Sequence, residues 1–309
     1  MPEKLTMSAA DWLLLVCLSV LWGGSFFFAK VAVEELPPLT LAFGRVAIAA
    51  AILAVLMRAR GDSFAPFASA WPAFLVLGLL NCAIPFSLLF WAQTHISSSL
   101  ASILNATTPI FTVLVAEVAT ADEKLTAGKL VGVIAGFLGV AVMLGHDALA
   151  GIGADVWAQL ACLAAAVCYA LAGVHGRRLA ALPAGTVATG QLIAAAVVLA
   201  PLAALVDRPW TSVRPSATPL AALLALAALS TALGYVIYFR VLARAGAVNL
   251  LLVTFLIPVS AILLGTIVLG ERLAPHHFAG MAIIAFGLAA IDGRLAQMMV
   301  RALRPKKFG

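Results

Sequence analysis

Residues 105–124 read Asn-Ala-Thr-Thr-Pro-Ile-Phe-Thr-Val-Leu-Val-Ala-Glu-Val-Ala-Thr-Ala-Asp-Glu-Lys. This apolar stretch carries a proline, Pro109, and ends at an acidic-basic pair. Residues 254–273 follow the same plan, with a proline at 258 and Glu-Arg-Leu at 271–273. Glycines 132 and 139 fall opposite glycines 280 and 287, an offset of about 148 residues. Self-similarity at a fixed spacing indicates an internal repeat, which we divide into residues 1–147 and 148–309.

The composition identifies the class of protein. Of the 309 residues, 64% are hydrophobic and 10% are charged, and the mean hydropathy is +1.11. A soluble domain cannot bury that much apolar surface, so we expect a polytopic membrane protein. The net charge of +6 does not indicate nucleic-acid binding, because the basic residues lie in short loops. The four cysteines lie within apolar runs without metal-ligand spacing.

About 20 apolar residues cross the hydrocarbon core as a helix. By this measure the chain contains ten spans, approximately at 12–33, 38–57, 71–93, 97–119, 126–145, 156–175, 185–206, 218–239, 246–269 and 274–292. The predicted fold class is an all-α polytopic membrane protein. Because each copy of the repeat has five spans, an odd number, the two copies are inverted relative to each other. Inverted repeats are typical of secondary transporters, whose substrate site lies near the midplane.

The loop charges predict the orientation. Fourteen lysines and arginines fall on the side of the N-terminus, four fall on the other side, and Arg45 lies within a span, which accounts for all 19. The positive-inside rule therefore predicts that both termini are cytoplasmic, in a bacterial inner membrane. The basic tail at 301–307 fits this orientation. The loops are short, so we expect no catalytic domain outside the membrane.

Three prolines lie near the middle of predicted spans, namely Pro85, Pro109 and Pro258. Proline frees a backbone carbonyl and kinks a helix. These prolines either are tolerated kinks or bend the helices around a central cavity. The matched places of Pro109 and Pro258 in the two copies favour a cavity, because broken helices at corresponding positions mark transport sites.

Arg45 is the one basic residue well inside a predicted span. A charge there is costly and usually functional. It either extends to the outer interface or faces the cavity, where its planar guanidinium would bind a carboxylate. Its repeat counterpart, Gln191, is also polar, which favours an interior position for both.

Asn81, Asn105 and Thr254 are polar residues on apolar helices. They either join helices by hydrogen bonds or contact the substrate. Glu123 and Glu271 are expected to cap or pair at helix ends. The glycine stripe at 128, 132, 136 and 139 predicts close helix packing, with a dimer face as one alternative.

Aromatic residues recur within the spans, several of them near mid-span: Trp22, Phe26, Phe86, Phe90, Tyr169, Tyr235 and Tyr238. Some of these could form an interfacial belt or face lipid. Trp22 coincides with Tyr169 in the repeat, which favours a shared position along a cavity. An aromatic cavity suits amphipathic or aromatic solutes, and organic cations by cation–π attraction.

The sequence lacks the nucleotide-binding glycine loop, the nucleophile elbow and the zinc-protease motif. We therefore expect no enzyme, no cofactor and no metal site. Transport would depend on the solute gradient or a coupled ion. No buried carboxylate stands out as a proton carrier, so we favour facilitative export.

The chain resembles the drug/metabolite transporter superfamily, specifically its ten-helix EamA-type exporters. The residues that carry the resemblance are Trp22-Gly23-Gly24-Ser25, Phe43-Gly44-Arg45 and the two proline-to-glutamate signatures. It covers residues of about 10–292 and extends to the aromatic amino-acid exporters of the superfamily. The resemblance implies export of amino acids, aromatic ones included, and related metabolites from the bacterial cytoplasm.

We therefore expect a secondary transporter that acts by alternating access. Its partners would be a small-molecule substrate and the lipid bilayer, without nucleic acid, and it would be a monomer or a weak homodimer. The residues predicted to bind substrate are Trp22, Ser25, Phe26, Arg45, Asn81, Phe86, Phe90, Asn105, Tyr169, Gln191, Tyr235, Tyr238 and Thr254. The alternatives are a multidrug or organic-cation exporter, for which Glu117 is the only candidate acid, and a membrane-embedded enzyme.

Overall fold

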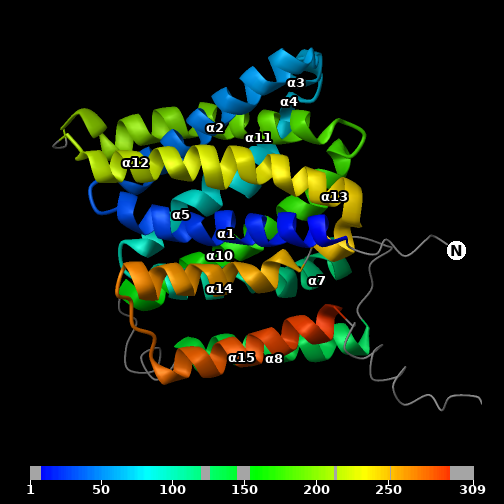
Figure 1. The fold of residues 1–309 in the computed structure, drawn as a ribbon, viewed down its shortest axis with the longest axis vertical. Coiled ribbons are helices and arrows are strands. Elements are labelled where there is room, and N and C mark those ends of the chain that lie inside the picture. The colour runs from blue at the N-terminus through cyan, green and yellow to red at the C-terminus, as the bar shows by residue number, and fades with distance from the viewer. Residues whose placement is uncertain (1–7, 120–125, 145–153, 212–213, 251, 293–309) are drawn as a thin grey trace, which may run out of the picture.

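The structure is a computed structural model that describes residues 8–119, 126–144, 154–211, 214–250 and 252–292. Throughout this part of the chain the regular structure is helical (Figure 1). Seven helical stretches are long and apolar enough to cross a membrane, and three shorter apolar helices accompany them. The protein is thus an all-helical membrane protein.

We call the helices up to α8 the first half and those from α10 onward the second half. The first half consists of α1 (Ala9–Ala32), α2 (Pro38–Arg60), α3 (Ala65–Ser69), α4 (Trp71–Gly78), a π-helical turn η1 (Leu79–Ala83), α5 (Ile84–Gln93), α6 (Ser98–Asn105), α7 (Thr108–Ala119) and α8 (Ala127–Leu144). The second half consists of α10 (Ala154–Gly176), α11 (Ala184–Leu202) with a π-helical end (Ala203–Asp207), α12 (Ala217–Ala225), a π-helical turn η5 (Leu226–Leu233), α13 (Gly234–Leu250), α14 (Val253–Val268) and α15 (Pro275–Asp292).

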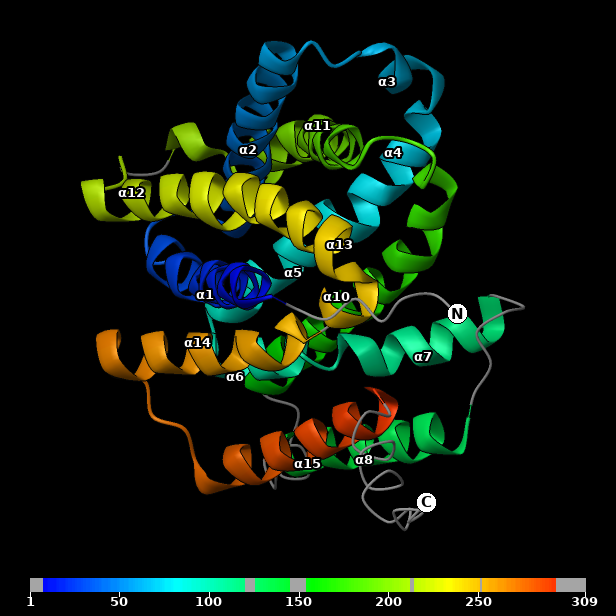
Figure 2. The same ribbon diagram turned by 45° about the vertical axis from the view of Figure 1, so that its right-hand side comes forward.

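Helix packing follows the duplication. Helix α2 packs against α11, and α8 packs against α15, so each of these pairs joins corresponding elements of the two halves. Helix α1 packs against α13 and α14, and its counterpart α10 packs against α5, α6 and α7. Helices α8 and α15 form a separate layer beside α7 and α14 (Figures 1 and 2).

The span predicted at 97–119 is interrupted in the structure. Helix α6 ends at Asn105 and α7 begins at Thr108. Pro109 has no N–H to donate to the carbonyl of Asn105, and the Thr108 hydroxyl donates to that oxygen instead, at 2.7 Å. Pro258, in contrast, lies inside α14, which is continuous.

The prediction of separate spans at 218–239 and 246–269 is wrong in one respect. Helix α13 continues through Arg240 and Arg244 to Leu250, where a connection was expected. The residues concerned are mostly good helix formers, so charge alone does not end the helix. Arg244 also donates to the buried Asp11 of α1 over 2.7 Å, which supports this added length.

Carboxylates of one half cap helices of the other at the end of the bundle where α1 finishes. Glu271 accepts backbone N–H groups of Ser98 (2.7 Å) and Ser99 (3.0 Å) at the start of α6. Asp207 accepts the N–H of Thr40, in the first turn of α2, over 2.6 Å. Such caps satisfy donors that a helix leaves unpaired. The expected capping by Glu271 is confirmed, whereas Glu123 lies outside the described residues.

Glu35 makes a third link of this kind. It accepts from the backbone N–H and the hydroxyl of Ser216, which precedes α12. These hydrogen bonds, the backbone one first, lower the pKa of Glu35 below its ordinary value. The three carboxylates therefore join the two halves at one end of the bundle.

The glycine stripe of α8 packs against other helices of the same chain. A Cβ at Gly132 would lie 2.5 Å from the carbonyl oxygen of Gly287 and 2.5 Å from the side chain of Ile291, both on α15. Gly139 also meets α15, and Gly136 meets Ile110 of α7. These glycines allow helix backbones to approach closely. Because the stripe faces α15 and α7 of the same chain, the alternative that it forms a dimer face is wrong.

We predict that Gly132→Ala destabilises the protein by about 1–3 kcal/mol, because α15 cannot yield to the added methyl group. Gly173→Ala is the matched control, since nothing lies within 4 Å of a Cβ at that helical position. It should be neutral or stabilising by up to about 1 kcal/mol. Thermal unfolding in detergent, followed by fluorescence, measures both. Equal melting temperatures for the two variants would contradict the packing described here.

Candidate functional site

Two π-helical turns occupy matched places in the two halves, η1 before α5 and η5 before α13. Pro85 follows η1, and its ring would clash with the carbonyl four residues earlier in a regular helix. In η5 the Thr231 hydroxyl donates to the carbonyl of Leu226 over 2.9 Å. π-Helical turns often occur at functional sites, and sequence analysis missed both.

Arg45, on α2, lies in the interior of the protein with 8% of its surface exposed. Its Nε donates to the hydroxyl of Thr231 in η5 over 2.9 Å. Its guanidinium carbon lies 3.8 Å from the centre of the Phe86 ring and 5.8 Å from that of Phe90. The arginine of the first half is therefore held by the π-helical turn of the second half and by aromatic rings.

The second half makes the reciprocal contact. Gln191, on α11, accepts from the Asn81 side-chain amide of η1 over 2.8 Å. The same amide donates to the Tyr235 hydroxyl over 3.3 Å. Arg45 and Gln191 are repeat counterparts, so each reaches the π-helical turn of the opposite half. These bonds form a polar cluster between the halves, which we call the polar centre and which consists of Arg45, Thr231, Asn81 and Gln191.

The charge of Arg45 is not neutralised within the part of the chain that the structure describes. There the only hydrogen-bond acceptor of its guanidinium is the neutral Thr231. The titratable side chains that interact with its charge are Tyr169, Tyr235 and Cys82, and none of these is a carboxylate. A buried charge without a partner is strongly unfavourable. The arrangement can therefore receive an anion, for which the remaining guanidinium N–H groups would be donors.

Aromatic side chains surround this centre. Phe86 stacks with Phe90 at 6.2 Å between ring centres, and Tyr235 stacks with Phe239 at 6.0 Å. The two pairs are repeat counterparts. Tyr238 contacts both Phe239 and Trp22, at 5.0 and 5.6 Å. The structure thus brings together most of the aromatic residues singled out in the sequence.

Four other predicted site residues lie on α1, α6 and α14. Phe26 packs in an apolar cluster with residues such as Leu89 and Leu104. Ser25 is buried on α1, and Thr254 is partly buried near the start of α14. Asn105 ends α6, and its side-chain oxygen is buried with no hydrogen-bond partner in the described part of the chain. For these four residues, a role in binding stays a prediction.

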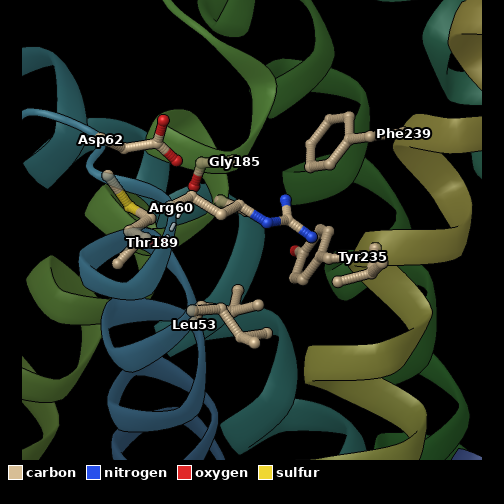
Figure 3. Close-up of a pocket in the computed structure, with 11 residues that line it drawn as sticks. Leu53, Arg60, Asp62, Gly185, Thr189, Tyr235 and Phe239 are labelled. Carbon is tan, nitrogen blue, oxygen red and sulfur yellow. Dashed lines mark hydrogen bonds between the residues drawn. The ribbon is translucent and has the colours of Figure 1, made fainter.

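A pocket of about 110 Å³ opens beside the centre, between α2, α11 and α13 (Figure 3). Its walls are formed by Leu53, Leu56, Met57, Arg60, Asp62, Gly185, Ala188, Thr189, Tyr235, Val236 and Phe239. Tyr235 belongs to both the pocket and the centre, because its hydroxyl accepts from Asn81. Because α2 ends at Arg60 and α11 begins at Ala184, the pocket lies at the end of the bundle where α1 begins.

Sequence analysis missed Thr231 and the two charged residues of the pocket. Thr231 carries no signal of its own in the sequence. Arg60 and Asp62 flank Gly61 at a helix end and are indistinguishable by sequence from topology anchors. In the described residues, no group of three or more histidine, cysteine or acidic side chains is arranged to hold a metal.

The comparisons with known proteins agree with this architecture. The model of the EamA-like transporter family matches residues 11–145 and again residues 156–291. The inner membrane transporter YedA of Escherichia coli K12 is 26% identical over 280 residues, which cover 90% of this chain and 89% of YedA. A crystal structure with 22% identity covers 94% of this chain and 100% of its own, with a TM-score of 0.66, and supports the fold.

A further relative has a more specific name. The "Probable terminal-alkyne amino-acid exporter" of Streptantibioticus cattleyicolor is 27% identical over 289 residues, which cover 93% of this chain and 95% of the relative. Because two family matches account for nearly the whole chain, the protein is a multi-pass membrane transporter and not an enzyme, and it belongs to the EamA-like transporter family.

Proposed function

We propose that the protein exports amino acids, aromatic ones included, and related small metabolites across the bacterial inner membrane. Two inverted halves, residues 1–147 and 148–309, each cross the membrane five times, and both termini are cytoplasmic. The reciprocal packing of the two halves supports this arrangement. Alternating access then consists of one half moving against the other around the polar centre.

The observation that carries the substrate assignment is the buried charge of Arg45, which has no carboxylate beside it in the described part of the chain. A substrate carboxylate would supply the missing negative charge in a bidentate geometry. The aromatic pairs would hold an apolar or aromatic side chain. The amino-acid exporter among the relatives points to the same class of substrate.

The rival function, export of organic cations, has less support. It needs an acidic residue in the cavity, whereas the charge that borders the centre is positive. Glu117, the candidate acid, lies near the end of α7 and is partly exposed. A cation entering the centre would be repelled by Arg45.

Transport is tested by uptake of labelled phenylalanine into proteoliposomes, with and without a proton gradient. We expect uptake without the gradient, because no carboxylate of the described residues contacts Arg45 to carry a proton. Uptake that requires the gradient would replace facilitative transport with proton coupling. No uptake of any amino acid under either condition would contradict the proposed substrate class.

Arg45→Gln should reduce phenylalanine uptake about tenfold or more, since the substrate carboxylate loses a charge-assisted pair. Uptake of phenylalaninamide, which has an ammonium group but no carboxylate, should not fall, because its only interaction with the charge of Arg45 is repulsive. Arg45→Lys keeps the charge without the planar fork and should give an intermediate result. An equal loss for both solutes, with an unchanged melting temperature, would refute carboxylate binding by Arg45.

Thr231→Val should also lower phenylalanine uptake, because it removes the acceptor that orients Arg45. It should cost about 1–3 kcal/mol of stability, since the Nε is left unsatisfied. Thr266→Val is the control, because the Thr266 hydroxyl donates within its own helix, to the Ile262 carbonyl of α14, and does not line the pocket. The stability cost should be smaller in an Arg45→Met background, where the variant loses only the hydrogen bond from the Thr231 hydroxyl to the Leu226 carbonyl. An equal cost in both backgrounds would show that Thr231 does not act through Arg45.

A further inference from the structure

The pocket between α2, α11 and α13 carries two opposite charges at its mouth. Arg60 is the last residue of α2, and its side chain extends into the pocket toward Tyr235 and Phe239 (Figure 3). Asp62 follows two residues later and also lines the pocket. Arg58, two residues earlier on the same helix, does not line the pocket, so a charge at this helix end does not by itself place a residue in the pocket.

The backbone fixes the positions from which these two side chains extend. Gly61 adopts a left-handed conformation with φ of 75°. The N–H of Asp62 donates to the carbonyl of Met57 over 3.0 Å, and that of Gly61 to the carbonyl of Arg58 over 3.2 Å. This is a Schellman motif. It reverses the chain directly after Arg60, so that both charges border one pocket.

Neither charge is paired with the other. Within the described residues, no ion pair or side-chain hydrogen bond involves Arg60 or Asp62, although both line the same small pocket. Adjacent opposite charges that remain separate leave a cation and an anion site side by side. A zwitterion satisfies both at once, its carboxylate on the guanidinium and its ammonium on the carboxylate.

The rest of the pocket favours an apolar substrate side chain. Leu53, Tyr235 and Phe239 form its inner wall. The pocket has a volume of about 110 Å³. For comparison, an apolar cavity of about 150 Å³ in another protein binds benzene. The pocket therefore suits one apolar side chain, while the charged head group stays at the mouth.

We propose that Arg60, Asp62 and this apolar wall form a loading site for zwitterionic α-amino acids at the cytoplasmic mouth, separate from the Arg45 centre. The inference rests on the proposed function and adds a first binding step to it. Tyr235 separates the two sites: its ring lines the pocket, and its hydroxyl accepts from Asn81 at the centre. The substrate carboxylate passes from Arg60 to Arg45.

The test uses inverted membrane vesicles, whose outer surface is the cytoplasmic face. Initial uptake rates over a range of phenylalanine concentrations give KM and the maximal rate for the wild type, Arg60→Gln and Asp62→Asn. We expect each substitution to raise KM about three- to tenfold, because one charge-assisted contact is lost at a solvent-accessible mouth. The maximal rate should be unchanged, since the centre is intact. Arg58→Gln is the matched control and should leave KM unchanged.

Two analogues separate the charges. Phenylalaninamide lacks the carboxylate, so its KM should not rise with Arg60→Gln. Phenylpropanoate lacks the ammonium, so its KM should not rise with Asp62→Asn. The loading site is refuted if Arg60→Gln behaves as Arg58→Gln does, or if it shifts phenylalanine and its amide equally.

Failure of the two proposals can be told apart. If the wild type transports phenylalanine and Arg60→Gln has no specific effect, only the loading site is wrong. If the wild type does not transport it, the proposed function fails. Equilibrium binding of labelled phenylalanine to purified Arg45→Gln protein, with and without Arg60→Gln, then decides the loading site. Equal binding by these two variants would refute it.

Discussion

A guanidinium buried between two halves of a membrane protein is the constraint on which this structure depends. A charged residue at the centre of a bilayer costs about 3 kcal/mol or more, so the surroundings of Arg45 must hold it in place. The fold does so with a hydroxyl from a π-helical turn and with the face of Phe86. Neither is an anion, so the positive charge of Arg45 remains uncompensated until a substrate carboxylate binds.

Duplication explains why the centre lies where it does. Each half supplies a helix with a polar residue, Arg45 or Gln191, and a π-helical turn that receives its counterpart from the other half. Neither half can complete a polar centre alone. The carboxylates Glu35, Asp207 and Glu271 add links between the halves at one end, while the pocket lies at the opposite end. The arrangement fits a transporter that is accessible from the end of the bundle where α1 begins.

Much of the fold could be predicted because it follows from local signals. Apolar length and the repeat located the helices, and the cost of a buried charge singled out Arg45. The π-helical turns could not be predicted, since a widened turn depends on a hydroxyl or proline meeting a particular carbonyl. The continuation of α13 is supported by the Asp11–Arg244 pair, whose partners lie far apart in sequence. The positions of Arg60 and Asp62 in a pocket could not be predicted, because they depend on which helices pack beside the end of α2.

The most direct test of the account is a distance between Arg45 and the substrate. Solid-state NMR on protein with ¹⁵N-labelled arginine in lipid, with ¹³C-carboxylate phenylalanine bound, measures the separation of the carboxylate carbon from guanidinium nitrogens. The account predicts a contact of about 4 Å, the separation of a hydrogen-bonded pair, that persists in Arg60→Gln and disappears when Arg45→Lys is added to Arg60→Gln. A short contact that survives in this double variant, or no contact in Arg60→Gln with substrate bound, would contradict it.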